Sequence, residues 1–324
     1  MKRRSLALLL AAPLVGGCRP RDRTAVLEGL VREVVAEMAR DLLQRTLDLY
    51  AAVRTFQAAP SAATREQARR AFAAAALAWK RAQAFRSGPF ASSQAFQRAA
   101  FWPASAAAID SLLAAPVVGE QVVESAGVEA RGLWALEQVL FAPRFEGAAE
   151  DAKLRSYALE LTANVLGYAR RLSRELGDAR AFSRSFAAQG ARSVEALGAQ
   201  SVDTLELVRG KLDRAARLMV APTAPELAVE GYYSRTSTDV MLALLIGTEA
   251  LYRGGLEELA TSVEPRVAPR VRGAYSRLHE RVRALGPQLE LAPATRPQAF
   301  RAAVGALAEL KHVYEVELRS ALDS

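Results

Sequence analysis

The sequence is poor in the side chains that most often carry chemistry. Its 324 residues include one cysteine and two histidines. A single cysteine cannot form a disulfide within the chain, and two histidines cannot supply a three-histidine metal site. The H-E-x-x-H motif of zinc proteases is also missing. We therefore expect a fold that is held together by packing alone.

Common catalytic and nucleotide-binding motifs are missing as well. The sequence has no G-x-S-x-G nucleophile turn, no G-x-x-x-x-G-K-[ST] phosphate loop and no G-x-G-x-x-G loop. A Ser-His-Asp set could be assembled only by free choice among many serines. No known class of catalytic site follows from these patterns.

The N-terminus has an apolar run that is too short to cross a membrane. As a helix, residues 5–17 would span roughly 20 Å, against a hydrocarbon core of ~30 Å. Basic residues 2–4 precede the run and Cys18 follows it. This arrangement is typical of a secretory signal.

Cys18 determines the anchoring that we expect. Val15-Gly16-Gly17-Cys18 resembles the bacterial lipobox, in which the cysteine is lipidated and becomes the mature N-terminus. We predict a signal peptide at residues 1–17 and a lipid-anchored linker at 18–23; the alternative is an ordinary signal peptide with a chance cysteine. Arg19 stands where aspartate would be the usual inner-membrane retention signal. We therefore expect a lipoprotein on the outer membrane, facing the periplasm.

The charge of the chain is positive but dispersed. Lysine and arginine number 43 against 35 acidic residues, for a formal net charge of +8. The excess lacks the clustered aromatic residues of a nucleic-acid surface, so we expect no nucleic-acid partner. Positive charge favours contact with anionic headgroups or with an acidic ligand.

Helical periodicity runs through the rest of the chain. Ala, Leu, Arg and Glu dominate, and no strand pattern competes. Thr64 and Gln67 have the spacing of a capping box at the start of the second long helix. We predict an all-α fold of two packed helical bundles, residues 24–180 and 181–324, with no substantial β-sheet. The expected helices are 24–57, a second from 64, 104–115, 119–142, 150–176, 190–219, 238–262, 264–286 and 297–322.

Four separated segments resemble the imelysin family. They are Ala78-Trp79…Ala84-Phe85-Arg86-Ser87-Gly88-Pro89, Phe101-Trp102-Pro103 with Ile109-Asp110, Arg131-Gly132-Leu133-Trp134-Ala135-Leu136-Glu137, and Tyr233-Ser234-Arg235-Thr236-Ser237-Thr238-Asp239. The third is similar to that family's GxHxxE motif. The resemblance implies an exported protein of two helical bundles with a pocket between them and a role linked to iron uptake. Some members of the family have been called metallopeptidases.

The chain departs from the GxHxxE pattern at its histidine. Trp134 occupies that position, and an indole nitrogen carries a proton and offers no lone pair to a metal. Glu137 alone is a poor site for a transition metal, so we predict no metal site and no cofactor. Iron or another metal is the alternative, and the ligand set does not support it. We expect Glu137 to accept hydrogen bonds from a ligand or to pair with an arginine such as Arg86 or Arg235. Trp134 is either core packing or a stacking surface for a ligand.

The resemblance also nominates further residues for a ligand pocket. Each has a structural alternative: a charge at a helix C-terminus, a helix N-cap, a fixed loop or a solvated carboxylate. The candidates, with Trp134 and Glu137, are Arg86, Trp102, Asp110, Arg235, Ser237 and Asp239.

The two histidines fall outside these segments. His279 stands beside Glu280 and Arg281, which predicts a solvated position. His312 and Glu315 have H-x-x-E spacing, a match too common in helical proteins to predict a metal site.

These observations predict a non-catalytic, ligand- or partner-binding accessory in iron acquisition, with an iron-uptake or outer-membrane protein as its partner. The competing interpretations are a metal-dependent peptidase or hydrolase with unidentified ligands, and an interaction module without a small-molecule pocket.

Overall fold

The computed structural model is helical throughout the part of the chain that it describes, residues 22–177, 179–221 and 224–323. No strand occurs within those ranges, which confirms the predicted all-α class. The predicted signal peptide, Cys18 and most of the linker at 18–23 lie outside the described residues. No helix within those ranges combines the length and the apolar character needed to cross a membrane.

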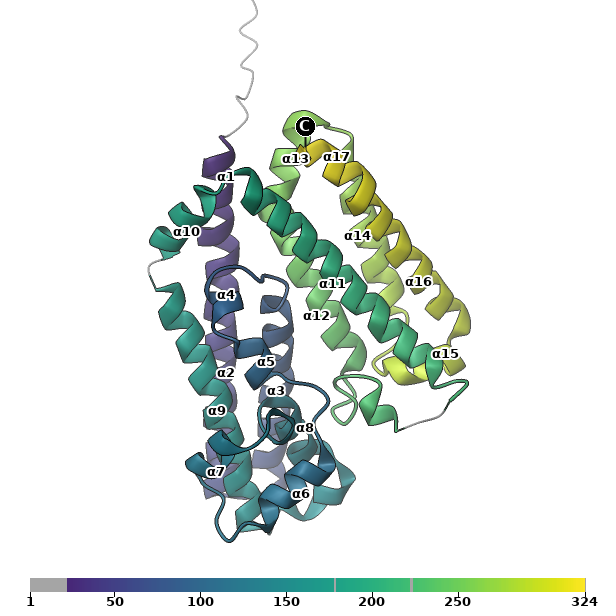
Figure 1. The fold of residues 1–324 in the computed structure, drawn as a ribbon. Helices are drawn as coiled ribbons and strands as arrows, with labels where there is room; N and C mark the ends of the chain where they lie inside the picture. Colours follow the sequence, from purple (N-terminus) through teal and green to yellow (C-terminus); the bar gives the residue numbers. More distant parts are fainter. Residues whose placement is uncertain (1–21, 178, 222–223, 324) are drawn as a thin grey trace, which may run out of the picture.

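The first group of helices is built on three long ones, α2, α3 and α9, with α2 packed against both of the others (Figure 1). Short helices α4 to α7 cover their sides, and α8 packs against α3 and α9. The α-helices are α1 Arg23–Gly29, α2 Ala36–Ala58, α3 Ala62–Ala82, α4 Pro89–Ser92, α5 Ala95–Ala99, α6 Ala106–Ala114, α7 Glu120–Ser125, α8 Leu133–Phe141, α9 Ala152–Leu176 and α10 Ala179–Ala187. A π-helical turn at Leu30–Val35 joins α1 to α2, and 3-10 turns cover Val128–Ala130 and Pro143–Ala149.

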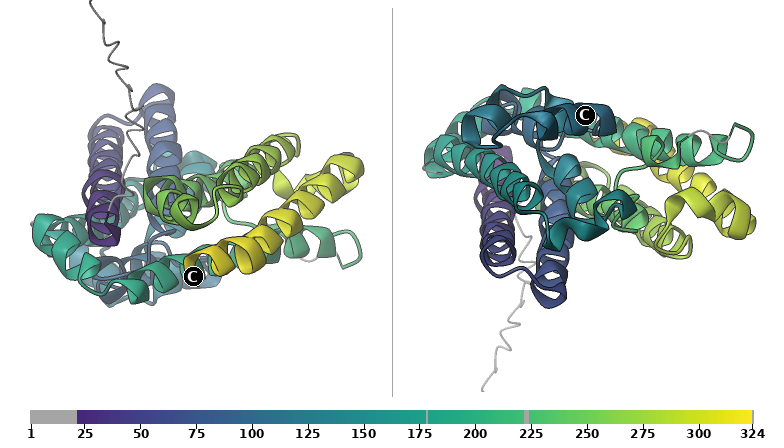
Figure 2. Two further views of the ribbon diagram at one scale, coloured as in Figure 1. Left: turned by 90° about the horizontal axis from the view of Figure 1, so that it is seen from above. Right: turned by 90° about the horizontal axis from the view of Figure 1, so that it is seen from below.

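The second group consists of α11, α12, α14 and α16, inclined to the first group (Figures 1 and 2). Within it α14 packs against α16, and α11 packs against α12 and α16. The α-helices are α11 Ala191–Arg217, α12 Ser237–Leu251, α13 Glu257–Val263, α14 Val267–Arg283, α15 Ala292–Thr295, α16 Pro297–His312 and α17 Arg319–Asp323. Two π-helical turns, Tyr252–Leu256 and Val313–Leu318, continue α12 and α16, and 3-10 turns cover Pro225–Leu227 and Leu289–Leu291.

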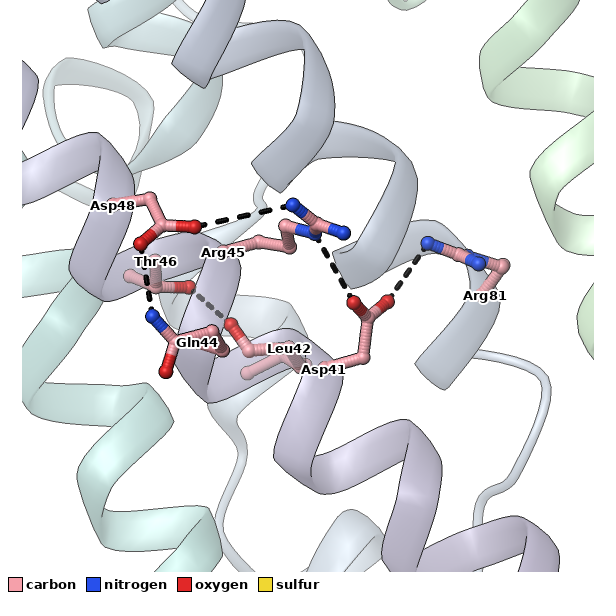
Figure 3. A network of polar contacts seen from close by, with 7 residues as sticks. All are labelled: Asp41, Leu42, Gln44, Arg45, Thr46, Asp48 and Arg81. Carbon is pink, nitrogen blue, oxygen red and sulfur yellow. Dashed lines mark hydrogen bonds and ion pairs between the residues drawn. The ribbon is translucent and has the colours of Figure 1, made fainter.

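The spacing of apolar residues explains how α2 and α3 pair. Phe72 and Trp79 are fully buried on one face of α3, and Trp79 donates its indole N–H to the Thr46 hydroxyl of α2 at 3.1 Å. At the edge of the interface Asp41 pairs with Arg81 at 2.8 Å and with Arg45 of its own helix at 3.2 Å (Figure 3). The long helices therefore form where the sequence predicts them, because one continuous face of each is apolar.

The cap of α3 differs from the prediction in its register. Ser61 is the N-cap and accepts the Thr64 N–H at 3.1 Å, while the Thr64 hydroxyl accepts the Ser61 N–H at 3.0 Å. Thr64 is thus the third residue of the helix rather than its cap, and the box uses a hydroxyl in place of the predicted Gln67.

The predicted helix 119–142 is broken in two. The chain leaves α7 at Ser125, makes a 3-10 turn and enters α8 only after Gly132, whose φ is +82°. A side chain is strained at that angle, and a glycine there allows the backbone to turn.

The two groups meet along a close seam between α3 and α12. A Cβ added at Gly247 of α12 would lie 2.2 Å from the Arg81 carbonyl oxygen and 2.9 Å from the Cβ of Ala84. The apolar core runs continuously through both groups. The structure thus has the two packed helical bundles expected from the sequence, while the division at residue 180 stays a prediction.

Candidate functional site

The helix that carries Trp134 and Glu137 is placed by the glycine before it. Gly132 precedes α8, and a Cβ added there would lie 2.5 Å from the carbonyl oxygen of Ala99. Only a glycine combines this close approach with a φ of +82°. The position and rotation of α8, and so the direction of both motif side chains, depend on that contact.

Trp134 is a packed core residue. Its side chain is 1% exposed, its Nε1–H donates to the Ala100 carbonyl at 3.2 Å, and its ring meets Phe72 edge to face. Lys80 Nζ lies 5.4 Å from the ring centroid, close enough for a cation–π interaction. The indole therefore uses its single N–H within the protein and supports a buried ammonium group with its ring.

Glu137 is buried and bonded to a loop of the second group. It is 4% exposed, and its Oε1 accepts the Ser234 backbone N–H at 2.9 Å and the Ser234 hydroxyl at 2.6 Å. These bonds, rather than the arginines considered from the sequence, satisfy that oxygen. Burial raises the pKa of Glu137 to about 7; the Ser234 bonds oppose that rise, and Glu230 and Glu290 add to it.

A tight turn at residues 231–236 presents Ser234 to Glu137. Thr236 N–H donates to the Gly231 carbonyl at 2.9 Å, and both Gly231 and Arg235 have positive φ, +78° and +58°. The Ser234 hydroxyl also bonds Thr236 Oγ1 at 2.8 Å. The turn directs the Ser234 amide inward and leaves Arg235 exposed.

Beside Glu137 lies a buried ion cluster that the sequence did not reveal. Lys80 of α3 and Lys211 of α11 both bond Glu230 Oε2 at 2.7 Å, with side-chain exposures of 2%, 7% and 10% respectively. Burial by itself would raise the pKa of Glu230, but the two lysines together lower it to about 2. Burial lowers the pKa of Lys211 to about 8 even though Glu230 opposes that change. We call Lys80, Glu230, Lys211 and the adjacent Glu137 the interbundle cluster.

The signal for this cluster was present but weak. Thr204, Val208, Lys211 and Ala215 are spaced 4-3-4 on the buried face of α11, so a lysine occupies a position where the helical period predicts an apolar residue. A charge at such a position needs a buried partner.

Ser237 stands near the cluster and bonds a different carboxylate. Its hydroxyl donates to Glu290 Oε2 at 2.7 Å and accepts the Leu289 N–H at 2.8 Å. It is the first residue of α12, after Thr236, which makes no side-chain capping bond. Ser237 thus ties α12 to the 3-10 turn at Leu289–Leu291.

Trp102 and Asp110 contact residues next to the cluster. The Arg214 guanidinium lies 5.3 Å from the centre of the Trp102 ring. Arg144 pairs with Asp110 at 2.5 Å and donates to Gln138, the neighbour of Glu137, at 3.0 Å. Both candidates are linked to the site through an arginine.

Arg86 and Asp239 lie apart from Glu137. Arg86 donates from its backbone N–H and its guanidinium to Gln200 of α11, at 2.7 and 2.9 Å, and it pairs with Asp203 at 3.3 Å. It is a second fastening between the groups. Asp239 is exposed in the first turn of α12, and partial burial raises its pKa. The structure thus brings Trp134 and Glu137 together with Ser234, which the sequence did not nominate by itself.

The donor set at α8 does not fit the metal that GxHxxE implies elsewhere. The Trp134 Nε1–H donates a hydrogen bond to the Ala100 carbonyl, and Glu137 Oε1 accepts two hydrogen bonds from Ser234. Among the described residues no group of three His, Cys, Asp or Glu side chains could hold a metal ion. These polar groups instead fasten α8 to the residues packed around it.

The two histidines do not supply the missing ligand. His279 is 7% exposed with Nδ1 3.4 Å from Glu249 Oε2, so the predicted solvated position is wrong: α14 turns that face onto α12. His312 is exposed at the end of α16, and Glu315 pairs with Lys311 at 3.4 Å.

Comparison with known proteins supports the resemblance seen in the motifs. The sequence model of the family described as Imelysin matches residues 35–314. The chain belongs to the Imelysin family. No match was found among curated proteins.

Two solved structures share the Imelysin-family fold of this chain. One is described as an iron-regulated protein A precursor from Parabacteroides distasonis, with 20% identity, a TM-score of 0.79, and coverage of 95% of this chain and 97% of that one. The other is an imelysin-like protein from Psychrobacter arcticum, with 14% identity, a TM-score of 0.72, and coverage of 93% and 95%. At these identities the likeness establishes the fold alone.

Glu230→Gln tests the buried ion cluster. The substitution leaves two buried ammonium groups without a counter-charge, so we expect the free energy of unfolding to fall by about 3–5 kcal/mol. Urea unfolding at neutral pH measures this loss. Glu309→Gln is the matched control: it breaks the exposed Arg277–Glu309 pair and should cost less than about 1 kcal/mol. An equal fall in the free energy of unfolding of the two variants would show that the buried cluster stabilises the fold no more than an exposed ion pair does.

Glu137→Gln tests the raised pKa. A carboxyl group whose pKa rises from 4.5 in the unfolded chain to about 7 in the folded one binds its proton more tightly when folded. Its contribution to stability is therefore complete below pH 4.5 and is lost as pH rises through 7. We expect the stability of the parent protein relative to Glu137→Gln to decline by roughly 3 kcal/mol across this window. Chemical unfolding at half-unit pH steps measures the difference, and a flat difference curve contradicts the assignment.

Proposed function

We propose that this chain is a membrane-anchored, non-catalytic binding accessory in iron acquisition. One observation carries the proposal: Trp134 occupies the histidine position of GxHxxE with its N–H bonded to Ala100 and its ring beside Lys80. A helix that lacks its nitrogen ligand cannot use the family motif to hold a transition metal.

The ionisable side chains of the site are bonded to other groups of the protein. Lys80 and Lys211 share one oxygen of Glu230, and Glu137 is bonded to Ser234, all with little exposure. A catalytic acid, base or nucleophile has to reach the reacting atoms of a substrate. These groups instead hold α3, α8, α11 and the 231–236 turn in one arrangement.

Binding is supported by the side chains around the turn. Tyr232 and Tyr233 stand edge to face, 5.2 Å apart, and both are half-buried, while Arg235 is exposed. Trp102, also half-buried, lies under Arg214. Tyrosine, tryptophan and arginine dominate binding hot spots because each combines a large contact area with a polar group. We assign the ligand or partner to this face of the junction.

The link to iron comes from the family and from its fold. A structural neighbour is described as an iron-regulated protein A precursor, and an accessory of iron uptake is consistent with an exported, anchored chain. The anchor itself depends on Cys18, which follows the basic and apolar segments of residues 1–17.

Metal titration tests the non-catalytic assignment. The purified protein is stripped with a chelator and titrated with ferrous and zinc salts, with Glu137→Ala and Trp134→His as companions. We expect no stoichiometric site in the parent protein that depends on Glu137. Tight one-to-one binding that Glu137→Ala abolishes would favour the metal-dependent hydrolase instead. Binding gained only in Trp134→His would support the indole as the decisive departure.

Cys18→Ala tests the anchor. Removing the lipidated residue should release the chain from the membrane fraction into the soluble periplasmic extract, because the lipid on Cys18 is the proposed attachment to the membrane. Cell fractionation and metabolic labelling with a fatty acid measure the change. A variant that stays with the membrane would refute lipid anchoring, and Arg19→Asp, with the anchor intact, reports on sorting between the two membranes.

A further inference from the structure

A groove of about 540 Å³ lies along α9, away from the interbundle cluster. Arg98 of α5, Glu120 and Glu124 of α7, and Arg131 line it opposite one face of α9. We call it the α9 groove.

The α9 groove has opposite charges at its two ends. Glu160, Asn164, Gly167, Arg171 and Arg174 line it at intervals of 4, 3, 4 and 3, which place them on one helical face. At ~1.5 Å per residue this face is roughly 20 Å long. Glu160 stands at one end near Glu120, where burial and that neighbour raise its pKa. Arg171 and Arg174 stand at the other end.

Two buried polar atoms of the groove lack partners. Arg131 is 8% exposed, and its Nη1 donates to the Glu124 carbonyl at 2.5 Å, but its Nε–H has no acceptor. Asn164 Oδ1 is buried without a donor. Native proteins rarely leave such groups unpaired. One donor and one acceptor unsatisfied in the same groove indicate a ligand that supplies the complement of each.

Four arginines of the groove make no ion pair within the described part of the chain. Among the described residues no ion pair joins Arg98, Arg170, Arg171 or Arg174 to a carboxylate. Five arginines against three glutamates give the groove a positive balance. Guanidinium groups recognise phosphate and carboxylate oxygens in pairs.

We propose that the α9 groove binds a small ligand with a phosphate or carboxylate group and a hydroxyl or amino group. The anion accepts a hydrogen bond from Arg131 Nε–H, and the positive balance of the groove attracts it. The hydroxyl or amino group donates to Asn164 Oδ1. This second site is separate from the junction face and does not depend on the function proposed there.

Calorimetric titration of the purified full-length chain with glycerol 3-phosphate and with citrate tests the proposal. Both probes combine oxyanions with a hydroxyl group. We expect one-to-one binding of at least one probe at low-millimolar concentration or below. Absence of binding for both at ~10 mM overturns the proposal, since each charge-assisted hydrogen bond should strengthen binding by about tenfold or more.

Two variants locate the binding. Arg131→Gln removes the buried donor and should weaken binding by about tenfold or more. Gly167→Leu fills the groove and keeps every charge: a Cβ there meets no atom within 4 Å, and leucine favours the helix, so this variant should fold even where Arg131→Gln does not. Arg301→Ala, which removes an exposed arginine of α16, is the control and should bind as the parent does. Unchanged binding in Gly167→Leu, or equal weakening in Arg301→Ala, overturns the site.

Vesicles of phosphatidylglycerol distinguish the source of the anion. The vesicle measurement uses a Cys18→Ala background, so that the proposed lipid anchor does not hold the chain to the membrane. If the groove takes a lipid headgroup, both groove variants lose vesicle co-sedimentation as well as probe binding. If it takes a free anion, the variants lose probe binding and keep the co-sedimentation of the parent.

Discussion

Glu230 accepts hydrogen bonds from two ammonium groups on a single carboxylate oxygen, and the two lysines come from α3 and α11. Lys80 belongs to the first group of helices and Lys211 to the second, so a single carboxylate links the two groups where they meet. Attraction between opposite charges is strong where little water screens it, and the penalty for leaving either lysine alone is correspondingly large. The turn that meets Glu137 follows Glu230 directly in the chain, so it lies at the same junction.

Replacing imidazole by indole changes what the motif helix contributes. An imidazole has a lone pair that can be offered to a cation, whereas the Trp134 nitrogen only donates, and it donates to Ala100. The larger ring also extends to Lys80 and supports its charge from the side. The family pattern has a histidine at this position, which could bind a metal. In this chain the tryptophan there packs against and bonds other residues of the core. Glu137 keeps its place in the motif and takes its hydrogen bonds from Ser234.

The sequence predicts the long helices well and the buried charges poorly. The faces of α2, α3 and α9 follow from apolar spacing because each helix buries one continuous stripe, a local property of the chain. The break before α8 was missed because Gly132 is required by a contact with Ala99, 33 positions away in the sequence. Trp134 and Glu137 were located through the family pattern alone.

The partners of the buried charges depend on which helices pack together, and no local pattern records that. Lys211 could have been suspected, since it interrupts the apolar face of α11, but nothing in the sequence joins it to Glu230. His279 was placed on the surface from its charged neighbours, and the packing of α14 on α12 decided otherwise.

Gly247 has a mechanical consequence. With no side chain between α12 and the Arg81 carbonyl, the two backbones interlock at close range, and rotation or sliding of one bundle against the other would drive main-chain atoms together. The seam at Gly247 therefore resists a hinged opening of one bundle away from the other.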